Sequence, residues 1–179
     1  MRRKILLDSD VVIHFIAGEL FSKLPDILPD FDFVLLDVVY ENELKKRHGR
    51  IIEQCVHFLR KMSIIKWEYT KEELIEFCEL QKIYGLGESA AMTYCRHHRD
   101  VLASSNWKDI ISYCNIHGIT HLSTMDLLHQ ALKDGILSEG ECDEFIYKVL
   151  KQGHKLPCMT MKDFQPRIYY RKGQGFIEE

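Results

Sequence analysis

An apolar run near the start of the sequence ends abruptly on an acidic residue. Residues 5–7 are Ile-Leu-Leu, Asp8 follows them directly, and a second carboxylate, Asp10, comes two residues later. A short apolar run of this kind is typical of a buried strand. Asp8 therefore has two interpretations: a ligand placed at the end of a strand, or the N-cap of the helix that follows. We expect Asp10 to be a capping or solvent-facing residue.

Further polar side chains follow the other apolar runs. The run at 31–36 leads into Asp37, Glu41 and Glu43; Glu88 follows a Gly-Leu-Gly turn; and the run at 101–104 leads into Asn106 and Asp109. Asn106 and Asp109 are three residues apart, so a helix would place both on one face. Glu41 and Glu43 are also consistent with ordinary acids in the first turns of a helix, and Asn106 with an N-cap.

In a parallel sheet these carboxylates would lie at the carboxyl ends of the strands, which is the edge where such sheets bind their ligands. We therefore expect Asp8, Glu88 and Asp109 to converge there, with Glu43 reaching the same cleft and Glu41 pointing away. Carboxylates gathered in one cleft raise one another's pKa unless a cation lies between them. Oxygen ligands without matching His or Cys favour Mg²⁺ or Mn²⁺ over zinc, and such ions promote phosphodiester cleavage.

The elements that must position these residues alternate along the chain. Apolar runs predict strands at 5–7, 31–36, 64–69, 101–104 and 119–123. Helical spacing and capping signals predict helices at 10–20, 38–46, 50–62, 70–84, 89–98, 107–117, 124–135 and 138–153. The capping signals include boxes formed by Thr70 with Glu73 and by Ser138 with Glu141. This alternation predicts an α/β fold, a three-layer α/β/α sandwich around a five-stranded, mainly parallel sheet.

The composition is that of a globular chain with reduced thiols. The 179 residues are 46% hydrophobic and 28% charged, and we expect one domain over residues 1–155 with a tail or appendage at 156–179. Six widely spaced cysteines and no apolar run of membrane-spanning length predict a cytoplasmic protein without a membrane partner. The net charge of −3 does not indicate nucleic-acid binding, so any such binding needs a local basic patch.

Two segments could supply that patch. The basic run at 43–50 is either a solvated helix face or a set of phosphate contacts. The tail sequence "RIYYRKGQG" at 167–175 combines aromatic faces with cations, which suits single-stranded RNA, although a frayed or partner-bound tail has the same composition.

Four of these motifs together resemble the PIN-domain ribonucleases. The segment "LLDSDVVI" is similar to the family's first strand with its acid, "VVYENEL" to the second acid, "GLGESAAM" to the third, and "SSNWKDI" to the signature after the fourth strand. The resemblance extends over roughly residues 4–155. It implies a PIN-like fold, and it implies that Ser104 supports the acidic cluster by hydrogen bonding.

The resemblance also implies a function. It implies a Mg²⁺- or Mn²⁺-dependent endoribonuclease with Asp8, Glu43, Glu88 and Asp109 as catalytic residues and with Asn106 joining them as metal ligands. Many compact family members are toxins, so an antitoxin partner and a homodimer are further expectations. Asn106 departs from the family, where Asp is common. The second acid is Glu43 when counted from the "EL" pair and Glu41 when counted from Val38. The alternative function is a non-catalytic nucleic-acid-binding or protein-interaction module with a degraded cluster.

Overall fold

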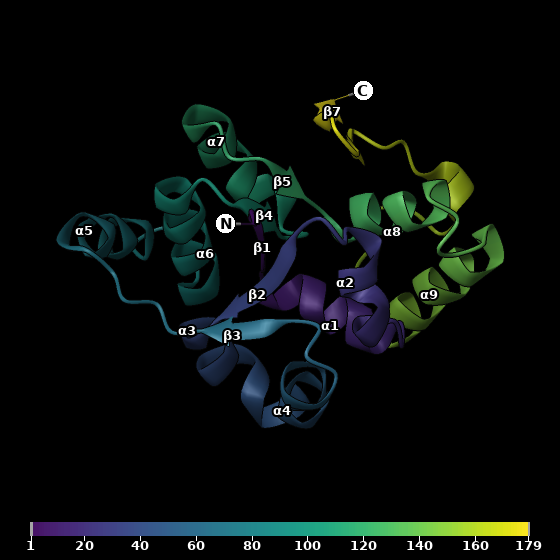
Figure 1. Cartoon of the computed structure of the whole chain (residues 1–179), viewed down its shortest axis with the longest axis horizontal. Coiled ribbons are helices and arrows are strands. Elements are labelled where there is room, and N and C mark those ends of the chain that lie inside the picture. Colours follow the sequence, from purple (N-terminus) through teal and green to yellow (C-terminus); the bar gives the residue numbers. More distant parts are fainter. Residues whose placement is uncertain (1, 179) are drawn as a thin grey trace.

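The computed structural model describes residues 2–178 and all of their side chains except that of Asp109. Within this range five strands form one parallel sheet in the order β3-β2-β1-β4-β5 (Figure 1). Their bounds are β1 Lys4–Leu7, β2 Asp32–Leu36, β3 Ser63–Ile65, β4 Val101–Ala103 and β5 His121–Leu122. All five overlap the segments that the sequence predicted, although β1 and β3 begin one residue earlier and β3 and β5 are shorter.

The central strands form because their side chains are apolar on both faces. Ile5, Leu6 and Leu7 of β1 are fully buried, and Ile5 lies opposite Phe33 on β2 and Val101 on β4. Runs that are apolar without alternation are characteristic of parallel sheets that helices cover on both sides. The strand that ends on Asp8 is therefore at the centre of the core.

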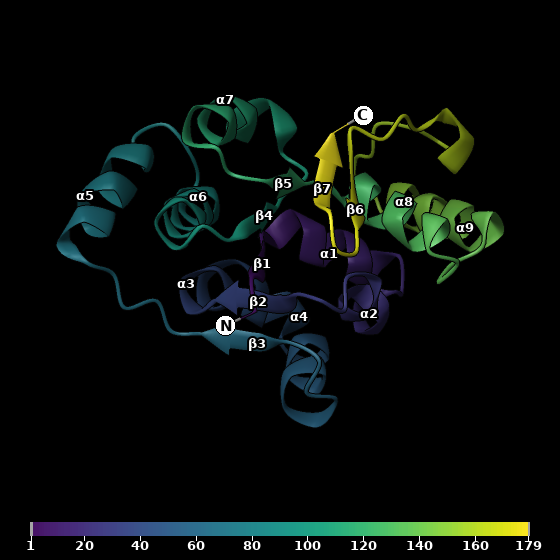
Figure 2. The same ribbon diagram turned by 45° about the horizontal axis from the view of Figure 1, so that its top comes forward.

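Helices cover the sheet in two layers, as the sequence predicted. One layer holds α6 (Leu86–His98), which packs against α5 (Lys71–Leu80) and α7 (Trp107–His117). In the other layer α1 (Ser9–Ala17) packs against α8 (Thr124–Lys133) and α9 (Glu139–Lys151), and α2 (Leu24–Ile27) packs against α8 (Figure 2). No helix in residues 2–178 is long and apolar enough to cross a membrane.

The predicted separate helices at 38–46 and 50–62 are one continuous helical segment. It runs through α3 (Asp37–Val39), a π-helical turn at Tyr40–Leu44, α4 (Lys45–Glu53) and a second π-helical turn at Gln54–Phe58. Gly49 lies inside this helical segment and does not end it. It is buried, and a Cβ at this position would lie 3.3 Å from the Tyr40 hydroxyl. The π-helical turn changes which side chains face the sheet edge, and it contains both Glu41 and Glu43.

The order of the strands creates a crevice between β1 and β4. The chain runs outward from β1 to β2 and β3, then returns on the opposite face of the sheet to add β4 on the other side of β1. The connections that leave the carboxyl ends of β1 and β4 therefore diverge to opposite faces. Parallel α/β sheets bind their ligands at such a switch point.

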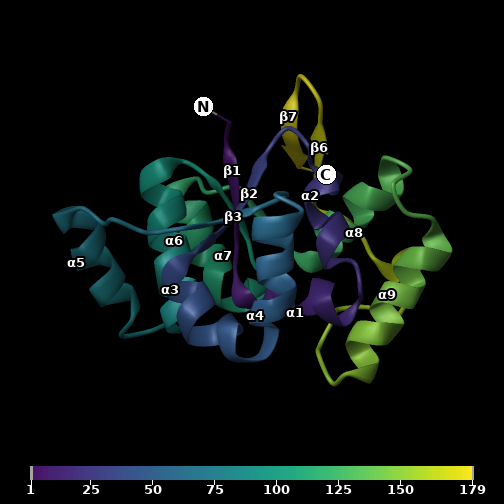
Figure 3. The same ribbon diagram turned by 60° about the horizontal axis from the view of Figure 1, so that its bottom comes forward.

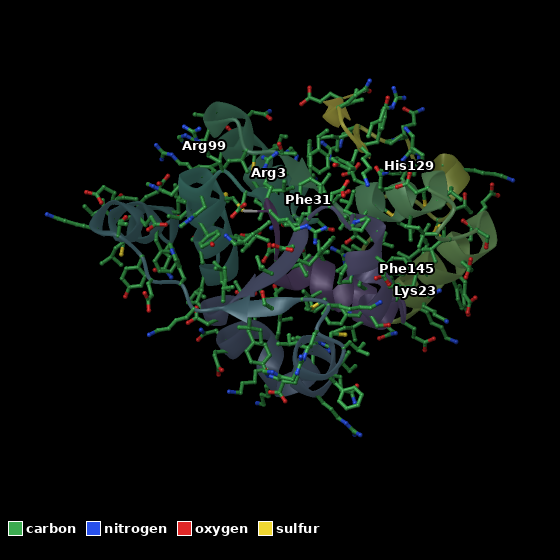
Figure 4. The ribbon with its side chains drawn as sticks, in the orientation of Figure 1. Arg3, Lys23, Phe31, Arg99, His129 and Phe145 are labelled. Carbon is green, nitrogen blue, oxygen red and sulfur yellow. The ribbon has the colours of Figure 1, made fainter. Side chains whose placement is uncertain are left out.

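The tail folds into ordered structure. A 3₁₀ turn at Met161–Asp163 precedes an antiparallel hairpin of β6 (Ile168–Arg171) and β7 (Gly175–Glu178). Gln130 of α8 holds the hairpin by hydrogen bonds of 2.8 and 3.2 Å to the backbone of Tyr170. Phe31, directly before β2, packs against Tyr170 and Phe176. The hairpin lies near the loop that leads into β2 (Figure 3), and Phe31 is labelled in that region (Figure 4).

Candidate active site

Asp8 is both the N-cap of α1 and a buried carboxylate at the switch point. Its Oδ1 accepts a hydrogen bond of 2.7 Å from the backbone N–H of Ser9, and its Oδ2 accepts one of 2.9 Å from the Ser104 hydroxyl. Only 3% of Asp8 is exposed. Burial, with a contribution from the charges of Asp10 and Glu43, raises the pKa of Asp8 well above its usual value. The N-cap interpretation of Asp8 is thus confirmed, and its role as a ligand stays a prediction.

The sequence predicted that Asp10 is a capping or solvent-facing residue, and the structure shows it half-buried. Its Oδ2 accepts a hydrogen bond of 2.8 Å from the backbone N–H of Ser105, and its Oδ1 accepts one of 2.6 Å from Val11. Burial and the charge of Glu88 raise the pKa of Asp10 to about 6, even though the backbone donors oppose the shift. Asp10 is therefore a member of the acidic group that sequence reasoning missed.

The turn after β4 supports both carboxylates. Ser104 is fully buried, donates to Asp8, and accepts a weak hydrogen bond of 3.3 Å from the backbone of Asn106. The Ser105 hydroxyl lies 2.7 Å from that of Thr124, which in turn contacts Nδ1 of His14 at 2.9 Å. A buried polar network of this kind fixes the orientation of the side chains that it holds.

Glu43 and Glu41 point in different directions. Oε1 of Glu43 accepts a hydrogen bond of 2.9 Å from the backbone N–H of Gly87, in the first turn of α6. A Cβ on Gly87 would collide with this carboxylate, so glycine permits the close approach. Glu41 instead forms an exposed ion pair of 2.8 Å with Lys45, one helical turn away. Glu43 lines the cleft described below, and Glu41 is not among its lining residues.

Glu88 reaches the same region from the start of α6. Its Oε2 accepts a hydrogen bond of 3.3 Å from the backbone of Gly85, the N-cap residue. Its Oε1 accepts a hydrogen bond from the side-chain amide of Asn106. Asn106 is the N-cap residue of α7 by position. The Asn106 side chain therefore holds Glu88.

One open cavity brings these side chains together, and we call it the acidic cleft. It has a volume of about 630 Å³ and contains side chains from α1, the first π-helical turn, α6 and the β4–α7 turn. Its polar lining residues include Asp8, Asp10, Glu43, Glu88, Ser105, Asn106, His14, His154 and Lys155. Among the described residues, none of the four carboxylates forms an ion pair with a Lys, Arg or His side chain.

Asp109 lies in the first turn of α7, three residues after Asn106. Its side chain lies outside the part of the chain that the structure describes. The predicted convergence of Asp109 with Asp8 and Glu88 therefore stays a prediction.

The donor set suits a hard divalent cation in its chemistry. Every candidate ligand is a carboxylate or amide oxygen, and buried Asp8 and half-buried Asp10 have raised pKa values that a cation would lower. In the described side chains, however, no group of three or more His, Cys, Asp or Glu is arranged to hold a metal ion. Instead the carboxylates accept hydrogen bonds from backbone and side-chain donors.

Histidines and cations line the edge of the acidic cleft. His14 is buried, and burial together with the nearby His154 lowers its pKa to about 4, so His14 is neutral at pH 7. The His14 and His154 rings are 5.8 Å apart. The basic run at 43–50 lies on α4, where exposed Arg47 and Arg50 line a separate hollow of about 430 Å³.

No protein-family model and no curated protein matches the chain. Among solved structures, the chain is similar to a PilT N-terminus domain protein from the hyperthermophilic archaeon Sulfolobus solfataricus P2, with a TM-score of 0.45 and 15% identity. The similarity covers 72% of this chain and 94% of that one. A likeness of this size assigns no activity, so we take the function from the side chains of the acidic cleft.

Proposed function

We propose that the chain is a metal-dependent ribonuclease. One observation carries this proposal: Asp8, Asp10, Glu43 and Glu88 come from three separate segments to one cleft at the switch point of the sheet. Packing does not require such a group, because neighbouring carboxylates repel each other, and Asp8 is buried and Asp10 half-buried. A bound cation would offset this repulsion, so cation binding by the cleft explains why the four carboxylates are together.

Each side chain has a role in this proposal. Asp8, Asp10, Glu43 and Glu88 would hold Mg²⁺ or Mn²⁺, and Asp109 would join them from the first turn of α7. The ion would supply charge stabilisation to the phosphate during hydrolysis of the phosphodiester bond. Ser104 and Ser105 orient Asp8 and Asp10 through hydrogen bonds of 2.9 and 2.8 Å. Ligands held by outer hydrogen bonds of this kind bind metals more tightly.

Asn106 has a role in the acidic cleft that differs from a lost metal ligand. Its amide donates to Glu88, a contact that a carboxylate at this position would not make. In our proposal Asn106 positions Glu88 and removes one negative charge from an already repulsive group. This observation favours the enzyme over the non-catalytic binding module.

The basic run supports an anionic, extended substrate. Lys46, Arg47 and Arg50 are exposed on α4, directly after Glu43 in the chain, and burial, Arg47 and His154 lower the pKa of His48. A strand whose phosphate lies in the acidic cleft could contact this run with its neighbouring phosphates. Neutralising these charges should weaken substrate binding and make it less sensitive to salt.

A cleavage assay on a mixed RNA pool tests the proposal. Wild-type protein should shorten the RNA when Mg²⁺ or Mn²⁺ is present and stop when EDTA is added. Asp8→Asn should abolish cleavage, whereas Glu41→Gln should cleave at the wild-type rate because Glu41 pairs with Lys45 away from the cleft. RNA that is bound but never cleaved, with any of these ions, would contradict the proposal and favour the binding module.

A further inference from the structure

A second cavity lies beside the acidic cleft, and we call it the tail cavity. Its volume is about 660 Å³, and one of its walls is the turn between β4 and α7. The opposite wall comes from residues 155–167 of the tail. Ser105, Asn106 and Lys155 line both cavities, so the tail cavity adjoins the acidic cleft along these three residues.

The walls of the tail cavity are mainly apolar. Met125, Leu156, Pro157 and Phe164 line it, together with the polar side chain of Gln165. Cavities of this size with apolar walls and a few polar groups are typical binding sites for small organic groups. A nucleobase matches this lining, because its ring faces are apolar and its edges form hydrogen bonds.

Specific contacts hold the tail wall in place. The Arg167 guanidinium stacks 3.1 Å from the centre of the Trp107 ring, and it also forms an ion pair of 3.2 Å with the buried Asp126. Further back in the tail, the backbone N–H of Met161 donates a hydrogen bond of 2.8 Å to Asp143 on α9. The cavity is therefore part of the folded structure rather than a space under a loose segment.

The cations that line the tail cavity outnumber its one carboxylate, which suits an anionic ligand. Lys108 and Lys155 are exposed lining residues, and the carboxylate is Asp163, which accepts a hydrogen bond of 2.7 Å from Thr160. Lys155 also lines the acidic cleft, so its ammonium group belongs to both cavities. A strand that passes from the cleft into the tail cavity would find cations for a phosphate at the boundary and an apolar surface for the attached base.

We propose that the tail cavity holds the nucleoside next to the phosphate that is cleaved, in a single-stranded RNA. This rests on the proposed function and adds the recognition of an unpaired base to it. The base lies against Leu156 and Phe164, and its phosphate lies near Lys108 and Lys155. A base can enter only if it is unstacked and unpaired, so the protein discriminates against duplex RNA.

Two cysteines allow a test that does not depend on cleavage. Cys158 is half-buried and lines the tail cavity, whereas Cys78 is exposed on α5, and the other four cysteines are buried. Alkylation of the two thiols by iodoacetamide would be followed by peptide mass spectrometry. The protein is Asp8→Asn with Mg²⁺, and the probe is a short single-stranded RNA at saturating concentration.

Bound RNA should slow the alkylation of Cys158 about tenfold and leave Cys78 unchanged. A strand of the same length without bases should not protect Cys158, although it carries the same phosphates. Equal alkylation of Cys158 with and without bound RNA would overturn the proposal. Equal protection by the strand without bases would also overturn it, because the backbone alone would then cover the cavity.

A substitution that fills the cavity gives an independent readout. Cys158→Trp should raise the KM for single-stranded RNA about tenfold, the scale of losing one stacked base, with little change in kcat. The matched control, Cys78→Trp, should change neither constant. If wild type cleaves RNA but RNA does not protect Cys158, the base site is refuted and the proposed function stands. If RNA protects Cys158 but wild type does not cleave it, the ribonuclease activity is refuted and the base site stands.

Discussion

The backbone N–H of Ser105 donates a hydrogen bond of 2.8 Å to Oδ2 of Asp10, which connects the start of α1 to the end of β4. This contact turns the second acid of α1 toward the switch point, where Asp8 already lies. The two carboxylates are therefore held by neighbouring residues of one turn, Asp8 by Ser104 and Asp10 by Ser105.

Asp10 makes the stability of the fold depend on pH. The pKa of Asp10 rises from 3.8 to about 6 in the folded protein, so the folded state binds this proton more strongly than the unfolded chain does. The contribution of this proton to the free energy of unfolding is fully present below pH 3.8 and is lost as the pH rises through about 6. The loss is on the order of 3 kcal/mol at pH 7.

Asp10→Asn should remove that loss. In EDTA the variant should melt higher than wild type at pH 7, and the difference should shrink toward pH 4. Melting temperatures across this range, read by circular dichroism, measure both effects. Parallel curves for the two proteins would show that Asp10 does not titrate in this range.

Ser104→Ala removes the hydroxyl that donates to buried Asp8. The variant should lose about 1–3 kcal/mol of unfolding free energy at pH 7, because a buried carboxylate oxygen loses its donor. Urea denaturation measures this change, and Ser112→Ala, at an exposed position on α7, is the control. An equal, small effect for both substitutions would show that the Ser104 contact does not hold Asp8.

Gly87→Ala should displace the Glu43 carboxylate without harming the fold. A Cβ at position 87 would occupy the place of Glu43 Oε1, and the exposed Glu43 side chain can swing away. Alanine is favoured over glycine in a helix by about 0.5–1 kcal/mol, so stability in EDTA should hold or rise. Binding of Mn²⁺, measured by calorimetry, should weaken about tenfold.

Gly140→Ala is the matched control for this change. Gly140 has the same position in α9 as Gly87 in α6, two residues after the N-cap, and a Cβ there meets open space. It should raise helix stability equally and leave Mn²⁺ affinity unchanged. If both variants bind Mn²⁺ like wild type, Glu43 is not a ligand.

Asn106→Asp replaces the amide that donates to Glu88 by a second carboxylate. In EDTA the two charges should repel and lower the unfolding free energy by about 1–3 kcal/mol. Mn²⁺ should recover most of this loss, so the melting temperature of the variant should rise more with Mn²⁺ than that of wild type. Asn115→Asp, exposed on the same helix, should show neither effect. Identical behaviour of the two variants would contradict the role given to Asn106.

The strands and the first acid could be predicted because their signals are local. An apolar run without alternation indicates a buried parallel strand, and the residue at its end is then at the carboxyl edge of the sheet. The capping boxes at Thr70 with Glu73 and at Ser138 with Glu141 were also readable, and both are present. These features depend on residues that are close in sequence.

The features that were missed depend on distant residues. Asp10 was expected to be a capping or solvent-facing residue, but Asp8 is the N-cap of α1, and Asp10 is half-buried and bound by the backbone of Ser105, 95 residues away. The donor is the backbone N–H of Ser105, which any residue except proline supplies, so the residue type at position 105 gives no signal for this contact. The π-helical turns at Tyr40–Leu44 and Gln54–Phe58 break the 3.6-residue period, so periodicity divided one helical segment into two.

The central claim is that the acidic cleft holds a divalent cation, and thermal melting with and without Mn²⁺ tests it most directly. At about a hundred times its dissociation constant, Mn²⁺ should stabilise wild type by roughly 2.7 kcal/mol. Glu41→Gln should respond like wild type. Asp8→Asn should be at least as stable as wild type in EDTA and should lose most of the response to Mn²⁺. Equal Mn²⁺ responses of wild type and Asp8→Asn would contradict the claim and leave Asp8 as the cap of α1 alone.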